Sequence, residues 1–171
     1  MCGEYNGPAK SHGTYPLNHV ALSVPDVDAA ADWYTSVLGF HELRPRTATD
    51  RSVMPDAPIF RIYPASLQKV RMAYLSAGNG VGVELFQFSD PGMAAGEEAN
   101  FEKNYFRGGI FHIAVTTPDI DETVKKVVAN KGRKIGDTVN VFGHHAAYIA
   151  DPWGNVVEVI TASFERIMAN R

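Results

Sequence analysis

The sequence is poor in cysteine, because its single cysteine, Cys2, lies close to the start of the chain. This excludes a disulfide within the chain and a zinc site built from several thiolates. The sequence also has no apolar run long enough to span a membrane and no charged-then-apolar leader at its N-terminus. We therefore expect a cytoplasmic protein without a membrane partner.

The sequence also lacks a large excess of positive or negative charge. The 16 basic and 19 acidic residues give a net charge of −3, and no basic run interrupts the sequence. This pattern offers no electrostatic case for binding nucleic acid. With 45% apolar residues among 171, the chain has the composition of a globular protein with a substantial core.

What the sequence does contain is an internal repeat. Residues 19–28 (HVALSVPDVD) return 93 positions later as residues 112–121 (HIAVTTPDID), and five of the ten positions are identical. Each copy is followed by an apolar run with one embedded carboxylate, which is Glu84 in the first half and Glu158 in the second. Two histidine strands and two glutamate strands predict a four-ligand metal site at a pseudo-twofold axis.

Strand geometry explains why these side chains should converge. Side chains alternate between the two faces of a strand, so His19 shares its face with small residues, while the opposite face is apolar. The same holds for His112 in the second copy. A carboxylate on a buried strand, such as Glu84 or Glu158, is costly unless it is paired or bound to a cation.

Each half is expected to be a βαβββ module, which gives an α+β fold. The first half has predicted strands at 17–24, 40–43, 70–75 and 81–88, and a helix that stops at Gly39. The second has predicted strands at 110–116, 133–136, 144–150 and 155–161, and a helix at 120–131. Residues 44–68 lack a clean period and are expected to form a long excursion.

The expected domain organisation follows from these elements. It comprises a flexible leader (1–15), a first module (16–90), a linker or lid (91–109), a second module (110–161) and a C-terminal tail or short helix (162–171).

Two motifs carry a resemblance to a known family. Residues 151–158 (DPWGNVVE) resemble its Asp-Pro-x-Gly-Asn-x-x-Glu ending, and residues 20–40, which end in Leu38-Gly39-Phe40, resemble its first strand–helix unit. Over residues 17–161 the chain thus resembles the vicinal oxygen chelate superfamily, which includes glyoxalase I. This resemblance implies a U-shaped, eight-stranded open barrel around one divalent ion.

The resemblance also implies a ligand set and a reaction. The metal ligands would be His19, Glu84, His112 and Glu158, and a mixed nitrogen and oxygen set does not choose among Zn, Ni, Co, Mn and Fe(II). The implied activity is that of a glyoxalase I-type lyase or isomerase, which moves a proton next to a carbonyl through a metal-bound enediolate. Glu158 is the first candidate base and Glu84 is its symmetry mate. The substrate would be a small molecule with vicinal oxygens, and the modules could pair within one chain or across a homodimer.

Other interpretations stay open. An extradiol-type dioxygenase would bind Fe(II) through two histidines and one glutamate, and metal-free relatives such as bleomycin-resistance proteins only sequester a ligand. A methylmalonyl-CoA epimerase-like activity uses similar chemistry, but that family typically has Gln where Glu84 stands. Several side chains have undetermined roles: Arg44, Arg46 and Arg51 as anion-binding cations, Arg71, Tyr148, His144 and His145 near the cavity, and Phe101, Tyr105 and Phe106 as a lid.

Overall fold

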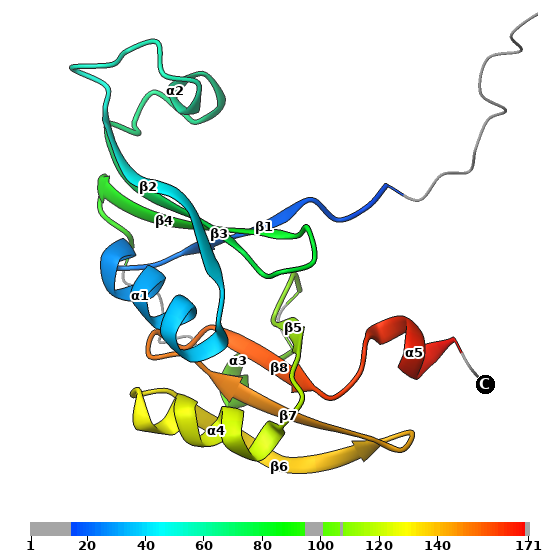
Figure 1. Cartoon of the computed structure of the whole chain (residues 1–171). Coiled ribbons are helices and arrows are strands. Elements are labelled where there is room, and N and C mark those ends of the chain that lie inside the picture. Colours follow the sequence, from blue (N-terminus) through cyan, green and yellow to red (C-terminus); the bar gives the residue numbers. More distant parts are fainter. Residues whose placement is uncertain (1–14, 95–100, 107, 170–171) are drawn as a thin grey trace, which may run out of the picture.

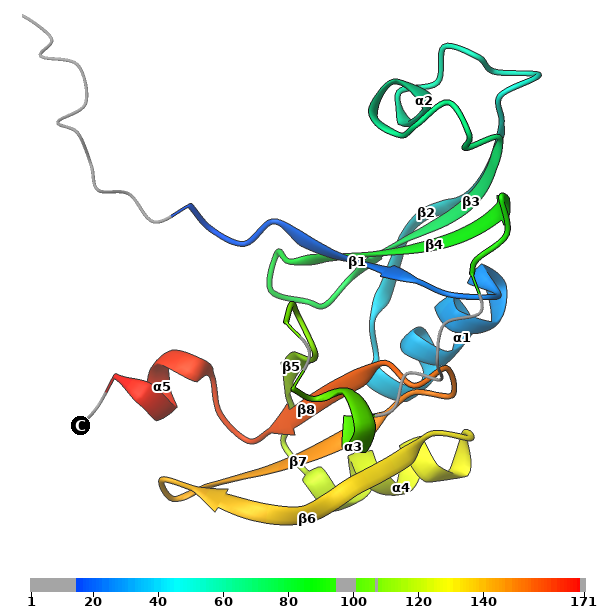
Figure 2. The same ribbon diagram turned by 180° about the vertical axis from the view of Figure 1, so that it is seen from behind.

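A computed structural model describes residues 15–94, 101–106 and 108–169 of the chain, and it contains two four-stranded sheets (Figures 1 and 2). The strand orders are β1-β4-β3-β2 and β5-β8-β7-β6. In each sheet the first two strands of that order are parallel and the remaining neighbours are antiparallel. The predicted α+β class and the two βαβββ modules are confirmed, and the two sheets do not close on each other.

The elements of the first module are β1 (His19–Ser23), α1 (Val27–Leu38), β2 (His41–Asp50), α2 (Ile59–Ile62), β3 (Lys69–Ser76) and β4 (Gly82–Asp90). A short helix, α3 (Phe101–Asn104), lies between the modules. The second module comprises β5 (Ile113–Thr116), α4 (Ile120–Ala129), β6 (Arg133–Val141), β7 (His144–Ala150) and β8 (Val156–Ile160), and α5 (Phe164–Met168) follows it.

The repeated Pro-Asp step starts both long helices. The Asp26 side chain accepts hydrogen bonds from the backbone N–H groups of Asp28 and Ala29, and the Asp119 side chain accepts one from Glu122. These bonds satisfy donors that the first turn of a helix leaves unpaired. At the other end of α1, Gly39 adopts a left-handed conformation (φ 72°), as its predicted role as a helix stop requires.

The main core joins the two modules. The helix-facing residues Val83, Leu85, Val157 and Val159 of both sheets belong to one buried cluster with α1 and α4. Two polar contacts between described residues cross from one module to the other. The Tyr34 hydroxyl donates to Asp151 Oδ2 at 2.9 Å, and Trp33 Nε1 donates to the Asn130 carbonyl at 2.9 Å.

A smaller apolar cluster lies on the other face of the first sheet. Its buried members come from β3, β4 and the segment around α2: Phe60, Leu67, Val70, Met72 and Phe86. Arg51 fastens this segment, because its Nε donates to the Leu67 carbonyl at 2.8 Å and its guanidinium lies 4.3 Å from the centre of the Phe60 ring.

Several predicted strand boundaries were wrong. Strand β5 begins at Ile113 instead of residue 110, so His112 lies just before the strand. Strand β2 continues to Asp50, so the excursion expected over residues 44–68 begins only after that residue, and β6 continues to Val141 rather than ending near residue 136. Register shifts follow Glu42 and Arg44 in β2 and Ile135 in β6. Such bulges break the alternation of side chains from which a strand is recognised in a sequence.

The structure describes the ends of the chain only in part. Helix α5 lies within residues 162–171, where a C-terminal tail or short helix is expected. Of the leader expected at residues 1–15, only Tyr15 lies within the described residues. Of the linker expected at 91–109, residues 95–100 and 107 lie outside them. None of the helices in the described part of the chain combines the length and apolar character needed to cross a membrane.

Candidate metal and substrate site

The first predicted ligand pair forms on neighbouring parallel strands. His19 opens β1 and Glu84 lies in β4, and His19 Nε2 is 3.6 Å from Glu84 Oε2. On the far side of the imidazole, Nδ1 lies 2.8 Å from Asn18 Oδ1. Because an amide oxygen only accepts, Nδ1 is the donor in this pair, and Nε2 is the ring nitrogen that faces Glu84.

Gly82 leaves room for His19 beside Glu84. It lies opposite His19 in the parallel pairing of β1 with β4. A side-chain Cβ at position 82 would stand only 3.1 Å from the Cβ of His19. The absence of a side chain therefore lets the imidazole settle beside Glu84.

The second pair repeats the first. His112 immediately precedes β5, Glu158 lies in β8, and His112 Nε2 is 3.6 Å from Glu158 Oε2. The imidazole centre is 4.5 Å from the Phe111 ring and 5.1 Å from the Tyr148 ring. Its Nδ1 is buried without a hydrogen-bond partner among the described residues, so ring packing holds this imidazole where Asn18 holds the other.

The geometry of each pair suits a shared metal ion. Metal–nitrogen and metal–oxygen bonds of about 2.1 Å keep two donors of one ion within about 4.2 Å of each other, and both pairs, at 3.6 Å, meet that limit. The structure brings the four predicted ligands together as two pairs. Within the described residues, no group of three or more His, Cys, Asp or Glu side chains is placed to hold a metal ion.

Both pairs remain accessible. The exposed fractions of the side chains are 48% for His19, 27% for Glu84, 24% for His112 and 21% for Glu158. Two donors on an open sheet face leave most positions of an ion free for further ligands. We call the face of β1 and β4 around His19 and Glu84 the first half-site, and the face of β5 and β8 around His112 and Glu158 the second half-site.

A tyrosine accompanies each glutamate. Tyr74 pairs with Glu84 between β3 and β4, and Tyr148 pairs with Glu158 between β7 and β8. Directly paired residues of neighbouring strands share a face, so both phenols belong to the half-sites. Burial, and then the charge of Glu158, raises the pKa of Tyr148. Sequence reasoning left the facing of Tyr148 undecided and missed Tyr74, although a tyrosine ten residues before the glutamate recurs in both halves.

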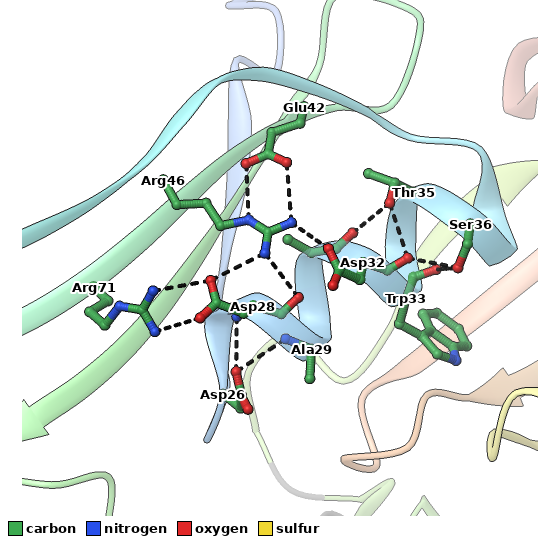
Figure 3. A network of polar contacts seen from close by, with 11 residues as sticks. Asp26, Asp28, Ala29, Asp32, Trp33, Thr35, Ser36, Glu42, Arg46 and Arg71 are labelled. Atoms are coloured by element: carbon green, nitrogen blue, oxygen red, sulfur yellow. Dashed lines mark hydrogen bonds and ion pairs between the residues drawn. The ribbon is translucent and has the colours of Figure 1, made fainter.

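Two of the candidate arginines serve the fold instead of the half-sites (Figure 3). Arg46 forms ion pairs with Asp28, Asp32 and Glu42. Arg71 binds both carboxylate oxygens of Asp28, at 2.7 and 3.0 Å. Hydrogen bonds from Arg71 and then Arg46 hold the pKa of Asp28 below its ordinary value. This network ties β2 and β3 to the start of α1.

Arg44 lies elsewhere. It pairs with Tyr74 across β2 and β3, and its guanidinium stands 4.9 Å from the centre of the Tyr74 ring. It is therefore a cation on the face of the first half-site. His144 and His145 open β7 beside the turn from β6, and no described side-chain contact joins either imidazole to a half-site.

The linker contributes to the second half-site. The ring of Phe101 in α3 meets the Tyr148 ring edge-on at 5.4 Å and lies 6.2 Å from the Phe111 ring. Of the three aromatic residues named as a lid, Phe101 therefore reaches the site face, while Tyr105 and Phe106 remain 55% and 72% exposed.

Comparisons with known proteins agree with this architecture. Residues 16–159 match the model of the Glyoxalase/Bleomycin resistance protein/Dioxygenase superfamily. The chain is 29% identical over 154 residues to a 2-epi-5-epi-valiolone epimerase of an Actinomyces species, which covers 86% of this chain and 80% of that protein.

It is also 25% identical over 128 residues to the mitochondrial methylmalonyl-CoA epimerase of Homo sapiens, which covers 75% of this chain and only 61% of that protein. Among solved structures, a glyoxalase family protein from Bacillus cereus superimposes with a TM-score of 0.71. The two chains are 17% identical, and the match covers 90% of this chain and 97% of the other.

Proposed function

Because the chain belongs to the Glyoxalase/Bleomycin resistance protein/Dioxygenase superfamily, we propose that it is a metal-dependent isomerase of glyoxalase I type that moves a proton on a carbon next to a carbonyl. The observation that carries the proposal is the duplicated His–Glu pair, with the same nitrogen–oxygen distance of 3.6 Å in both modules. The similarity to two epimerases favours an isomerase over a lyase within this class.

Four side chains would hold the divalent ion, namely His19, Glu84, His112 and Glu158. Their nitrogen and oxygen donors suit Zn, Ni, Co, Mn or Fe(II). When bound, such an ion supplies Lewis-acid stabilisation of the negative charge that develops on a carbonyl oxygen, and its open positions suit a substrate with vicinal oxygens.

The two glutamates divide the proton transfer. In the first step, a proton leaves the carbon beside the carbonyl and binds a carboxylate oxygen of Glu158, while the C–H electron pair moves toward the carbonyl. In the second step, the carbon takes a proton on its other face from Glu84, which would enter the cycle as the protonated acid, and this inverts the centre. Glu158 would then release its proton to water and Glu84 would take one up, so that both groups return to their starting states. A carboxyl on each side of the carbon is what an epimerisation needs, because removal and return must occur on opposite faces.

A second copy of the chain completes each site in this proposal. Each half-site is open and offers two of the four ligands. No strand of one described sheet pairs with a strand of the other, and the modules contact each other through α1 and α4. A twofold dimer would place the second half-site of one chain against the first half-site of its partner, and the symmetry would create two complete sites.

Complementation between two inactive variants tests the dimer. One variant carries His19→Ala and Glu84→Gln, and the other carries His112→Ala and Glu158→Gln. When the two are unfolded and refolded together, half of the dimers should be mixed and hold one intact site, so about a quarter of the wild-type activity should return. Activity that stays absent in the mixture, with both proteins dimeric, would show that all four ligands belong to one chain.

Exchange of a carbon-bound proton tests the chemistry. The protein loaded with each candidate metal is incubated in D2O with methylmalonyl-CoA or with 2-epi-5-epi-valiolone, and deuterium uptake is followed by NMR. Glu158→Gln should lower the exchange rate about 10³-fold, because it removes the base. The matched control is Glu122→Gln, which changes an exposed carboxylate paired with Lys126 on α4.

Two results would replace this function with another. Oxygen uptake with a catechol and Fe(II), without proton exchange, would establish the dioxygenase chemistry. Protein that purifies without metal, and binds none when titrated, would instead belong with the binding proteins of the superfamily.

A further inference from the structure

The rings of Tyr74 and Tyr148, which lie beside the two glutamates, take part in packing, but the proposed proton transfer does not use their hydroxyls. We propose that the hydroxyls of Tyr148 and Tyr74 are substrate-binding donors, one in each half-site, that hydrogen-bond to an oxygen of the bound substrate. This inference rests on the proposed function.

The pairing of the strands places both tyrosines alike. Tyr74 is the direct partner of Glu84, and Tyr148 is the direct partner of Glu158. In both hairpins the residue before the tyrosine is a fully or almost fully buried alanine, Ala73 or Ala147, on the helix side. The alternation of side chains therefore turns both phenols to the face that carries the ligands.

Neither hydroxyl has a strong hydrogen-bond acceptor among the described residues. Tyr34, which has a structural role, donates to Asp151 at 2.9 Å. The Tyr74 hydroxyl reaches only Met72 Sδ, at 3.5 Å, and thioether sulfur is a weak acceptor. Tyr148 is half-buried, and its hydroxyl is not among the buried polar atoms that lack a partner, so it is accessible at the surface of the half-site. No hydrogen bond from this hydroxyl to another described residue is seen, and it is therefore available to donate to a substrate oxygen.

The ring of Tyr148 is also held in place. It lies 5.1 Å from the His112 ring on one side and meets the Phe101 ring edge-on at 5.4 Å. A donor fixed before the substrate binds loses little freedom on binding, which makes its hydrogen bond more effective. Tyr148 is therefore expected to contribute more than Tyr74, for which the ring contact described is the guanidinium of Arg44, 4.9 Å from the ring centre.

Binding of acetohydroxamate, a small chelator with two vicinal oxygens, tests the inference without knowledge of the natural substrate. The variants are Tyr148→Phe and Tyr74→Phe, which remove only the hydroxyl, and the control is Tyr15→Phe, because Tyr15 is 97% exposed. Titration calorimetry of the metal-loaded proteins should show acetohydroxamate binding about five- to tenfold more weakly to Tyr148→Phe. Tyr74→Phe should show a smaller loss, and Tyr15→Phe none.

Metal content measured on the same samples distinguishes failure of this inference from failure of the proposed function. Tyr148→Phe should keep the metal content of the wild type, because the ring that packs on His112 remains. Acetohydroxamate affinity within about twofold of the wild type in a metal-loaded Tyr148→Phe protein would overturn the role of the hydroxyl alone. A wild-type protein that binds no metal would overturn both the function and this inference.

Discussion

The two modules are built on one frame but hold their histidines in different ways. Both place a glutamate beside a histidine at 3.6 Å and a tyrosine beside the glutamate. In the first module, Asn18 orients the imidazole through a hydrogen bond. In the second, aromatic rings surround it and its Nδ1 has no partner in the described chain. The frame fixes the ligand pair, and the support around the pair is free to differ.

The residue paired with the tyrosine on the next strand of the sheet differs as well. Arg44 lies beside Tyr74 in the first module, whereas Ile135 lies beside Tyr148 in the second. The segment around α2 covers part of the first face, and α3 reaches the second. A site assembled from the two halves would thus have one cationic wall and one apolar wall, which suits an asymmetric substrate.

Removal of the histidines is expected to have the largest effect on the two half-sites. His19→Ala and His112→Ala should each lose most of the bound metal, because each removes one of the two donors of a half-site. His112→Ala should also lower the melting temperature, since contacts between aromatic rings contribute about 0.5–1.5 kcal/mol each. Metal analysis after dialysis and thermal unfolding check both effects. Equal metal content in wild type and variants would contradict the assignment of the ligands.

The contact between modules gives the next largest effect. Tyr34→Phe should lower the free energy of unfolding by about 1–3 kcal/mol, because it leaves the buried Asp151 carboxylate without one donor. The equivalent residue of the second module, 93 positions later, is the buried Val127, whose side chain makes no hydrogen bond.

The cost should depend on pH. Burial raises the pKa of Asp151, and the Tyr34 hydrogen bond opposes that rise. Because the pKa of Asp151 is raised in the folded protein, its protonated form contributes to the free energy of unfolding at low pH. This contribution is lost as the pH rises from 3.8 through the raised pKa. The loss in Tyr34→Phe should therefore be larger at neutral pH than at pH values near 4, as denaturant unfolding at both would show. An equal loss at both pH values would contradict this account.

The smallest effect concerns the matched pair Asp28 and Asp121. Arg71 and Arg46 lower the pKa of Asp28, whereas Asp121 has no ion pair with an arginine in the part of the chain that the structure describes. The stability from Asp28 is present above pH 3.8 and lost as the pH falls toward its lowered pKa. Asp28→Asn should lower the melting temperature at neutral pH and less in acid, while Asp121→Asn should change it little at either. Identical pH profiles for the two variants would contradict the role of the arginines.

The sequence allowed much of each half to be predicted because its signals are local. Asp26 and Gly39 mark the ends of α1, and the repeat marks the strands that carry His19, Glu84 and Glu158 and the strand that His112 immediately precedes. The bulges in β2 and β6 could not be predicted, since a bulge erases the alternation that identifies a strand. The sequence also could not predict whether the two modules form a site within one chain or across a dimer. A repeat specifies how each module folds, but not which module faces which.

The tyrosines show a different limit. Their spacing from the glutamates was visible in the sequence, but it gains meaning only when the hairpins prove to have the same register. Tyr74 could have been found by extending the search for repeats beyond the histidine and glutamate segments.

Gly82 has a consequence of its own. Its counterpart in the second module is Val156, which tolerates a side chain because His112 lies just outside the ladder of β5 with β8. A methyl group at position 82 would press on the His19 Cβ from 3.1 Å. Gly82→Ala would therefore require His19 to shift by a few tenths of an ångström in one module only, which would disturb the first half-site without changing any of the four predicted ligands.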